Sequence, residues 1–223
     1  MRRFRRSSLL AAVAAIALAS PLYAASPAHT GAGPILVHFS EAEKADLKRI
    51  SAYLNTIKSV QGHFTQVNAD GKTEQGTFYL KKPGRMRFEY QKPNPNLIIA
   101  DGTTVAVENA DLKTTDRYPL VNSPLRLLLS ENIDLTTDSH VSALKREQGA
   151  ISVTARENSA VASGSITLTL ADSGGSLELR QWEVVDAQGA HTTVVLNDVR
   201  ETADIPARLF VIEDLSPFKK NGR

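Results

Sequence analysis

The 223-residue chain contains no cysteine, which excludes disulfide bonds and leaves its stability to a hydrophobic core. About 200 residues suffice for one domain with a sizeable core, so neither cross-links nor metal ions are needed to explain folding. A lipid-modified N-terminus requires a cysteine directly after the cleavage point. We therefore expect that the chain is not itself a lipoprotein.

Long apolar runs are also missing, since the longest one, Leu9 to Ala19, is too short to cross a membrane stably as a helix. Four arginines precede this run and small residues follow it, which predicts a secretory signal peptide cleaved after Ala24. The residues after the arginine pairs match a twin-arginine signal only loosely, so ordinary secretion is favoured. We predict a signal peptide at 1–24, a disordered arm at 25–39 and a single domain at 40–223, located in the periplasm.

Dense runs of lysine and arginine are absent after the predicted signal peptide, although phosphate backbones attract such runs. The formal net charge of +2 includes the four arginines of the signal, and removing them leaves −2. The sequence pI of about 8.8 therefore does not indicate a nucleic-acid partner. We exclude DNA and RNA as partners.

Signatures of catalysis and of metal binding are missing as well. No HExxH sequence, no histidine pair at ligand spacing and no glycine-rich phosphate loop occurs. Ser163 lacks the context of a nucleophile elbow, and turn formation explains the aspartates of Asp70-Gly71 and Asp101-Gly102. We predict no enzyme, no catalytic residue, no cofactor and no metal site, and the histidines are interpreted as surface or strand-end residues: His29, His38, His63, His140 and His191.

From Ser40 onwards the pattern predicts an amphipathic helix of about four turns. Ser40 and Glu43 have the spacing of a capping box. One face then carries apolar residues at helical spacing, namely Leu47, Ile50, Tyr53, Leu54 and Ile57. We expect this face to cover an apolar surface and the opposite face to meet water, with Glu41, Lys44, Lys48 and Asn55.

After Gln61-Gly62 the pattern changes to the alternation typical of strands. Short turns separate the predicted strands and favour antiparallel pairing. Between two groups of strands, Ser123 as N-cap and Pro124 at the first helical position predict a short helix rich in leucine. The predicted strands cover residues 64–67, 76–80, 85–90, 97–100, 103–107, 141–147, 151–156, 165–170, 177–185 and 192–199. Further candidates are 111–117 and, as a last edge strand, 210–212.

These elements together predict a mainly β protein with helices (α+β). So many strands must curl or split into layers, and amphipathic helices need one apolar surface to cover. We therefore expect a strongly curved antiparallel sheet of about ten or eleven strands, with two or three helices on its concave face. The apolar faces of the strands carry aromatic and flexible side chains, and composition alone does not decide between core packing and ligand contact.

The order and spacing of several segments resemble the LolA family of outer-membrane lipoprotein carriers. The resemblance extends over nearly the whole chain after the signal peptide. It implies an incomplete antiparallel β-barrel whose open side is covered by a helical lid. The segments that carry it are the helix at 50–57, Val60-Gln61-Gly62-His63-Phe64-Thr65-Gln66, residues 76–90 with the turn Lys82-Pro83-Gly84, residues 97–102, and Ser123-Pro124-Leu125.

The resemblance implies a carrier that shields acyl chains during transfer through the periplasm. Its expected partners are acylated lipoproteins, an inner-membrane lipoprotein-releasing ABC transporter and an outer-membrane lipoprotein acceptor, and we expect the carrier to be a monomer. The strand after the Pro-Gly turn is then expected to line the cavity, and the leucine-rich helix to form the lid. The expected acyl-chain cavity contains Leu54, Phe64, Phe78, Leu80, Met86, Phe88, Tyr90, Leu127 and Leu128.

Lys82 departs from the family, which commonly has an arginine at this place whose guanidinium holds the lid helix through its carbonyls. The resemblance makes Lys82 the expected lid latch. An ammonium lacks the planar fork of a guanidinium, so we expect a weaker latch unless Arg85 or Arg87 takes over. Strand alternation places both arginines on the outer face, where they are suited to docking a membrane partner.

Three other functions stay open on the sequence. One is a carrier of another hydrophobic ligand, such as a lipid or a pigment, and another is a lipid-sensing periplasmic regulator that signals through a partner domain. A lipid hydrolase ranks last, because no convergent set of reactive groups is visible.

Overall fold

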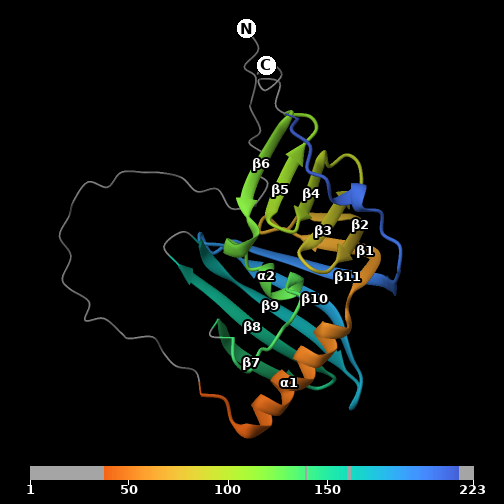
Figure 1. Ribbon diagram of the computed structural model, residues 1–223. Coiled ribbons are helices and arrows are strands. Elements are labelled where there is room, and N and C mark those ends of the chain that lie inside the picture. The colour runs from red at the N-terminus through yellow and green to blue at the C-terminus, as the bar shows by residue number, and fades with distance from the viewer. Residues whose placement is uncertain (1–37, 139, 160–161, 216–223) are drawn as a thin grey trace, which may run out of the picture.

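A computed structural model describes residues 38–215 except 139, 160 and 161, and shows one large sheet with helices packed against it (Figure 1). The predicted signal peptide, its cleavage point and most of the predicted arm lie outside the described residues. Within the described residues, no helix is long and apolar enough to span a membrane.

All strands belong to a single sheet in which each strand is antiparallel to its neighbours. Two helices, α1 (Glu41–Thr56) and α2 (Arg126–Leu129), and two 3₁₀ turns, η1 (Leu120–Asn122) and η2 (Ala207–Phe210), complete the fold. The strands are β1 (Ser59–Val67), β2 (Thr73–Lys81), β3 (Arg85–Tyr90), β4 (Asn96–Asp101), β5 (Thr104–Asn109), β6 (Thr114–Pro119), β7 (Val141–Glu147), β8 (Ala150–Ser159), β9 (Ala162–Asp172), β10 (Leu177–Val185) and β11 (His191–Glu201).

The strand order is β6-β5-β4-β3-β2-β1-β11-β10-β9-β8-β7, so each half of the chain forms a meander and the two meanders join where β1 pairs with β11. Eleven strands agree with the prediction of ten or eleven. The sheet is open, with β6 and β7 as its two edges. The predicted incomplete barrel is thus confirmed in its coarser part, a mainly β protein built on one antiparallel sheet.

The predicted helices are confirmed only in part, because α1 is the one main helix of the described residues. The central helix is shorter than expected: α2 has four residues and begins at Arg126, after η1. Ser123 is therefore not its N-cap, although the Ser123 hydroxyl accepts a hydrogen bond from the Leu125 N–H at 3.3 Å. The prediction of a lid made of two or three full helices is therefore wrong within the described residues.

The prediction of a last edge strand at 210–212 is also wrong. Phe210 ends η2, which lies against β3 and β4, and the Arg87 guanidinium donates to the Leu209 carbonyl at 3.0 Å. Phe210 and Ile205 are buried there, outside the main core cluster, together with Ile99 and Ala106. The tail packs across the outer face because that face also offers apolar side chains to cover.

Helix α1 begins as predicted, because Ser40 and Glu43 form a complete capping box. The Glu43 N–H donates to the Ser40 hydroxyl at 3.3 Å, and the Ser40 N–H donates to the Glu43 carboxylate at 2.7 Å. The buried face of α1 includes Leu47, Ile50 and Leu54, each with no exposed surface. The predicted helix and its apolar face are confirmed.

One residue of the predicted water-facing side of α1 is placed otherwise. The Asn55 side-chain amide donates to the Ile133 carbonyl and its oxygen accepts from the Ile133 N–H, both at 2.9 Å. Asn55 therefore holds the loop between α2 and β7 against α1. The loop comes from 78 residues further along the chain, a separation that helical periodicity does not reveal.

We predict that Ser40→Ala lowers the free energy of unfolding by about 1 kcal/mol, because one N-terminal N–H of α1 loses its acceptor. Ser40→Asp, which keeps an acceptor at the cap, should retain most of the stability. Urea unfolding of the two variants and the wild type measures this difference. Equal losses in both variants would contradict the capping role.

Candidate functional site

An aromatic cluster lies at the centre of the apolar face of the sheet, with Phe88 of β3 in the middle. The Phe88 ring centroid is 4.6 Å from that of Phe64, 5.8 Å from that of Phe78 and 5.8 Å from that of Trp182. Tyr90 meets Phe64 edge-on at 5.1 Å. These tilted, edge-on and offset arrangements are the geometries that aromatic rings favour.

The Phe64 ring reaches Phe88 across a glycine on β2. Phe64 pairs with Gly76 in the register of β1 and β2, and a Cβ atom at Gly76 would lie 2.5 Å from the Phe64 ring and 2.0 Å from the Glu89 carbonyl oxygen. No side chain fits there without moving the ring or the next strand. Gly76 thus permits the close packing of the aromatic cluster.

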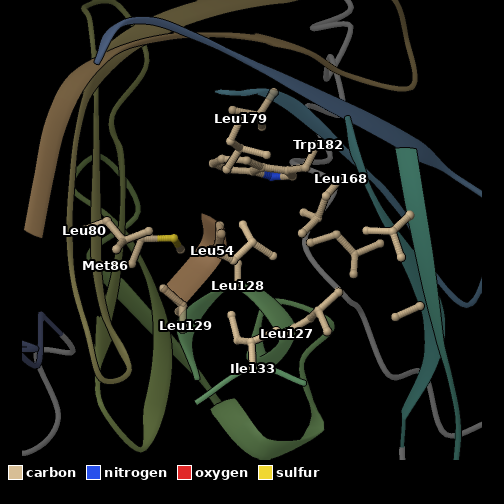
Figure 2. Close-up of a cluster of buried hydrophobic side chains, with 14 of the residues drawn as sticks. Leu54, Leu80, Met86, Leu127, Leu128, Leu129, Ile133, Leu168, Leu179 and Trp182 are labelled. Carbon is tan, nitrogen blue, oxygen red and sulfur yellow. The ribbon is translucent and has the colours of Figure 1, made fainter. Parts of the chain in front are cut away.

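All nine residues predicted for the acyl-chain cavity lie in or against the same core cluster. Eight are buried, and Tyr90 is half-buried with its hydroxyl donating to the Gln66 side-chain oxygen at 2.7 Å. Burial raises the pKa of the Tyr90 phenol. Figure 2 shows Leu54 and Leu128 in the middle of the cluster, with Leu80 and Met86 at the left and Trp182 above.

A cavity of about 180 Å³ opens beside this cluster, between the C-terminal end of α1 and strands β10 and β11. Of the nine predicted residues, Phe78, Leu80 and Leu128 line it. Leu54, Phe64, Met86, Phe88, Tyr90 and Leu127 are not among its lining residues; they fill the core around it. The cavity therefore lies between β1 and β2 on one side and β10 and β11 on the other, and not against β3.

Most of the cavity wall consists of residues that the sequence analysis did not select. Trp182 and Leu179 come from β10, Leu196 from β11, Tyr53 from α1, and Ile57 from the position directly after α1. The sequence held one signal that could have found Trp182, since it is the only tryptophan of the chain and alternates with polar residues in its strand. Which strands would face it across the sheet depends on pairing that local patterns do not show.

The turn between β2 and β3 holds the C-terminal ends of both helices. The Lys82 ammonium donates to the Leu54 carbonyl of α1 at 2.9 Å, and the Gly84 N–H donates to the Leu129 carbonyl of α2 at 2.9 Å. The last carbonyls of a helix have no partner inside the helix, so these two bonds satisfy groups that otherwise need water. Gly84 has φ of +73° and sits against Gly102, a position suited to glycine.

Lys82 thus reaches a helix carbonyl, but the helix is α1 and not the leucine-rich α2 that contains Leu127 and Leu128. Neither neighbouring arginine replaces it: Arg85 is exposed, and Arg87 bonds to Glu89 and to the Leu209 carbonyl on the outer face. Burial, together with a smaller effect of the nearby charge of Lys58, lowers the pKa of the Lys82 ammonium to about 8.

Helix α1 is also anchored by charge at its first half. The Arg49 guanidinium donates to the Asp172 carboxylate at 3.0 and 3.3 Å and to Asp46 at 3.2 Å, and Arg146 of β7 also contacts Asp46. The hydrogen bonds from Arg49 hold the pKa of Asp172 below its ordinary value. Asp46 is buried, and its two arginine partners compensate its charge.

Within residues 38–215, without 139, 160 and 161, no group of three or more His, Asp or Glu side chains could hold a metal ion. The cavity wall is mainly apolar, and its charged members are Glu178 and Glu201. The site is suited to holding hydrocarbon.

We predict that Phe88→Ala lowers the free energy of unfolding by about 3–5 kcal/mol, because the ring that contacts three others is replaced by a cavity. Phe88→Leu should cost clearly less, since it fills most of the space. Urea unfolding measures both. A loss below about 1 kcal/mol for Phe88→Ala would show that the centre of the cluster is loosely packed.

We also predict a pH dependence from Lys82. Its pKa of about 8 in the folded protein lies below the ordinary 10.5, so between these values the unfolded chain binds the proton and the folded protein does not. Stability from this group therefore rises with pH across this window. Between pH 7.5 and pH 9.5, the free energy of unfolding of the wild type should rise relative to that of Lys82→Met. The rise should be at most about 1 kcal/mol, because water partly screens the ammonium.

Lys72→Met, at an exposed lysine, provides the matched control in the same urea unfolding series. If the Lys82→Met difference from the wild type stays constant with pH, or follows that of Lys72→Met, the lowered pKa of Lys82 is refuted.

Comparison with known proteins agrees with this geometry. A family model described as "Outer membrane lipoprotein carrier protein LolA" matches residues 55–213. An outer-membrane lipoprotein carrier protein of Chromohalobacter salexigens is 26% identical over 78% of this chain and 85% of the relative. One of Bordetella avium is 29% identical over 73% and 80%, and one of Methylococcus capsulatus is 32% identical over 49% and 57%.

Among solved structures, a LolA superfamily protein from Nitrosomonas europaea is 12% identical, with a TM-score of 0.40 over 74% of this chain and 97% of that chain. This likeness is too slight to support a conclusion. The family model alone matches more than half of the chain, from the end of α1 to the segment after η2. The protein therefore belongs to the LolA family of outer membrane lipoprotein carrier proteins.

Proposed function

We propose that this protein binds the acyl chains of lipoproteins in the periplasm and carries them to the outer membrane without catalysis. Family membership supports a carrier rather than an enzyme. The single observation that carries the proposal is the apolar cavity of about 180 Å³, which reaches from the surface to the buried side chains of Phe78, Leu80 and Leu128.

An acyl chain needs such a shelter because its exposure to water is costly. Burial contributes about 0.8 kcal/mol for each methylene, so a chain of about sixteen carbons is stabilised by up to roughly 12 kcal/mol. The cavity as it stands is smaller than the roughly 300–1,000 Å³ typical of ligand sites. Binding therefore requires the covering elements to move, and the cost of that movement lets the carrier release its cargo.

The bonds that hold those covering elements favour such a movement. Helix α2 has four residues, and the Gly84 N–H to Leu129 carbonyl bond ties its end to the sheet. Lys82 supplies one bond to the end of α1. We propose that α2 with Leu127 and Leu128 forms the moving lid, and that Lys82 latches α1 beside it.

We further propose that the open sheet wraps around these helices as an incomplete barrel. The contact between Phe88 and Trp182 supports this architecture, because β3 and β10 are four places apart in the sheet. In a flat sheet these strands would lie about 19 Å from each other, at about 4.8 Å for each spacing. Ring centroids only 5.8 Å apart therefore favour a sheet that bends toward its helices.

The nine predicted cavity residues are then the walls of an enlarged site, of which the existing cavity is one end. From the family we propose two partners: an inner-membrane lipoprotein-releasing ABC transporter that supplies the cargo, and an outer-membrane acceptor that takes it. The exposed Arg85 on the outer face is suited to docking at one of these partners, because its charge stays free of the core.

Copurification with an acylated lipoprotein tests the proposal, with a cavity-filling variant as the sharpest probe. Leu196 is buried in the cavity wall, and Leu196→Phe replaces it with a larger, aromatic side chain. We expect roughly tenfold less retained lipoprotein, equivalent to about 1.4 kcal/mol, because the space for the chain is already occupied. Mass spectrometry of the retained material measures the amount and identifies the ligand.

Val211→Phe provides the matched control, because Val211 is exposed and lies outside the cavity. Thermal melting of both variants shows whether each is folded. The same cargo without its acylated cysteine should not copurify with any variant. Equal recovery with Leu196→Phe and the wild type would refute the cavity assignment, and retention of a lipid or pigment instead of lipoprotein would establish a different hydrophobic cargo.

A further inference from the structure

Strands β10 and β11 separate along half of their length. They pair from Gln181 opposite Val195 to Val185 opposite His191. Before Gln181, β10 pairs only with β9, while β11 beyond Val195 pairs with β1. We call the line between these two strands the seam. It is closed by pairing at residues 181–185 and 191–195, and it is open at residues 177–180 and 196–201.

Backbone irregularities lie on both sides of the open half. The register of β10 against β9 shifts between Leu179 and Gln181, and the register of β1 against β11 shifts between Gln61 and His63. Opposite that second shift, Asp198 has φ of +51°, a left-handed conformation uncommon for residues other than glycine. Such bulges terminate pairing and turn strands away from each other.

A side chain of α1 replaces the missing strand at this place. The Leu179 N–H donates to the Tyr53 hydroxyl at 2.8 Å, where a continued ladder would offer a carbonyl of β11. A buried N–H without a partner is costly, so Tyr53 stabilises the separated strand. The same hydroxyl ties α1 to β10 across the mouth of the cavity.

The cavity and the open seam coincide. Glu178 and Leu179 of β10 and Leu196, Val199 and Glu201 of β11 line both. Val199 is 40% exposed and Glu178 is about half exposed, whereas Leu196 is buried. Along the open seam, the cavity wall therefore changes from charged, hydrated residues at the surface to apolar residues in the interior.

We propose that this seam is the entrance through which a single unbranched hydrocarbon chain reaches the interior, and that Tyr53 closes it. The inference rests on the proposed carrier function and specifies where its cargo enters. An apolar cavity of about 150 Å³ takes a molecule of the size of benzene, so the present space accepts only the end of a chain.

Trp182 provides the measurement, because it is the only tryptophan and lies in the cavity wall. An ω-brominated dodecanoic acid quenches tryptophan fluorescence when its bromine reaches the ring. Stopped-flow mixing of this probe with the purified full chain should quench Trp182, and the rate reports passage through the entrance.

Two variants should change that rate in opposite directions. Tyr53→Phe keeps the ring and removes the hydroxyl, so uptake should become about fivefold faster, the effect of losing one neutral hydrogen bond. Val199→Phe enlarges a side chain at the rim and should slow uptake several-fold. Loss of stability alone would not shift the two rates in opposite senses, and thermal melting of each variant measures that loss.

Val121→Phe, at an exposed residue of η1, is the matched control and should leave the rate unchanged. If Trp182 is quenched but neither Tyr53→Phe nor Val199→Phe alters the rate, the seam is not the entrance, while the carrier function stands. If a saturating amount of probe leaves Trp182 unquenched, the interior does not take hydrocarbon and the proposed function fails with the entrance.

Discussion

The carbonyl groups at the ends of two helices set the constraint on which this structure depends. Helices α1 and α2 cover the apolar face of the sheet, and their last carbonyls need donors. One turn, Lys82-Pro83-Gly84, supplies donors to both, through the Lys82 ammonium and the Gly84 N–H. The same turn leads into β3, which places Met86 and Phe88 in the interior. The helices that cover the core and the strand that lines it are therefore linked at this one turn.

This linkage explains how a chain without cysteine keeps a core that a carrier must be able to open. The aromatic cluster around Phe88 is packed in favourable geometries, whereas the space near Trp182 and Leu196 stays partly empty. Packing is therefore close around Phe88 and looser on the side of the cluster that faces β10 and β11. Dense packing resists opening, so movement is expected where the wall already contains a gap and where β10 and β11 no longer support each other.

Much of the local structure followed from residue patterns. The capping box of Ser40 and Glu43, the apolar face of α1 and the alternation of Met86 and Phe88 with arginines are local relations, and each agreed with the structure. Where distant segments decide the environment, the patterns were insufficient. Asn55 looked like a water-facing helix residue but holds Ile133, and residues 210–212 looked like a strand but follow a 3₁₀ turn on the outer face.

The sequence by itself determined the secondary structure class, the number of strands to within one and the inward-facing residues of β3, because these depend on periods of two and 3.6 residues. The family was expected from the order and spacing of several segments, and the family model shows it. Only the tertiary structure decided which helix Lys82 holds, that Trp182 and Tyr53 belong to the cavity, and that β10 and β11 part beside it. The physical reason is that these features arise from contacts between segments as many as 126 residues apart, as between Tyr53 and Leu179, and local propensity carries no information on such pairs.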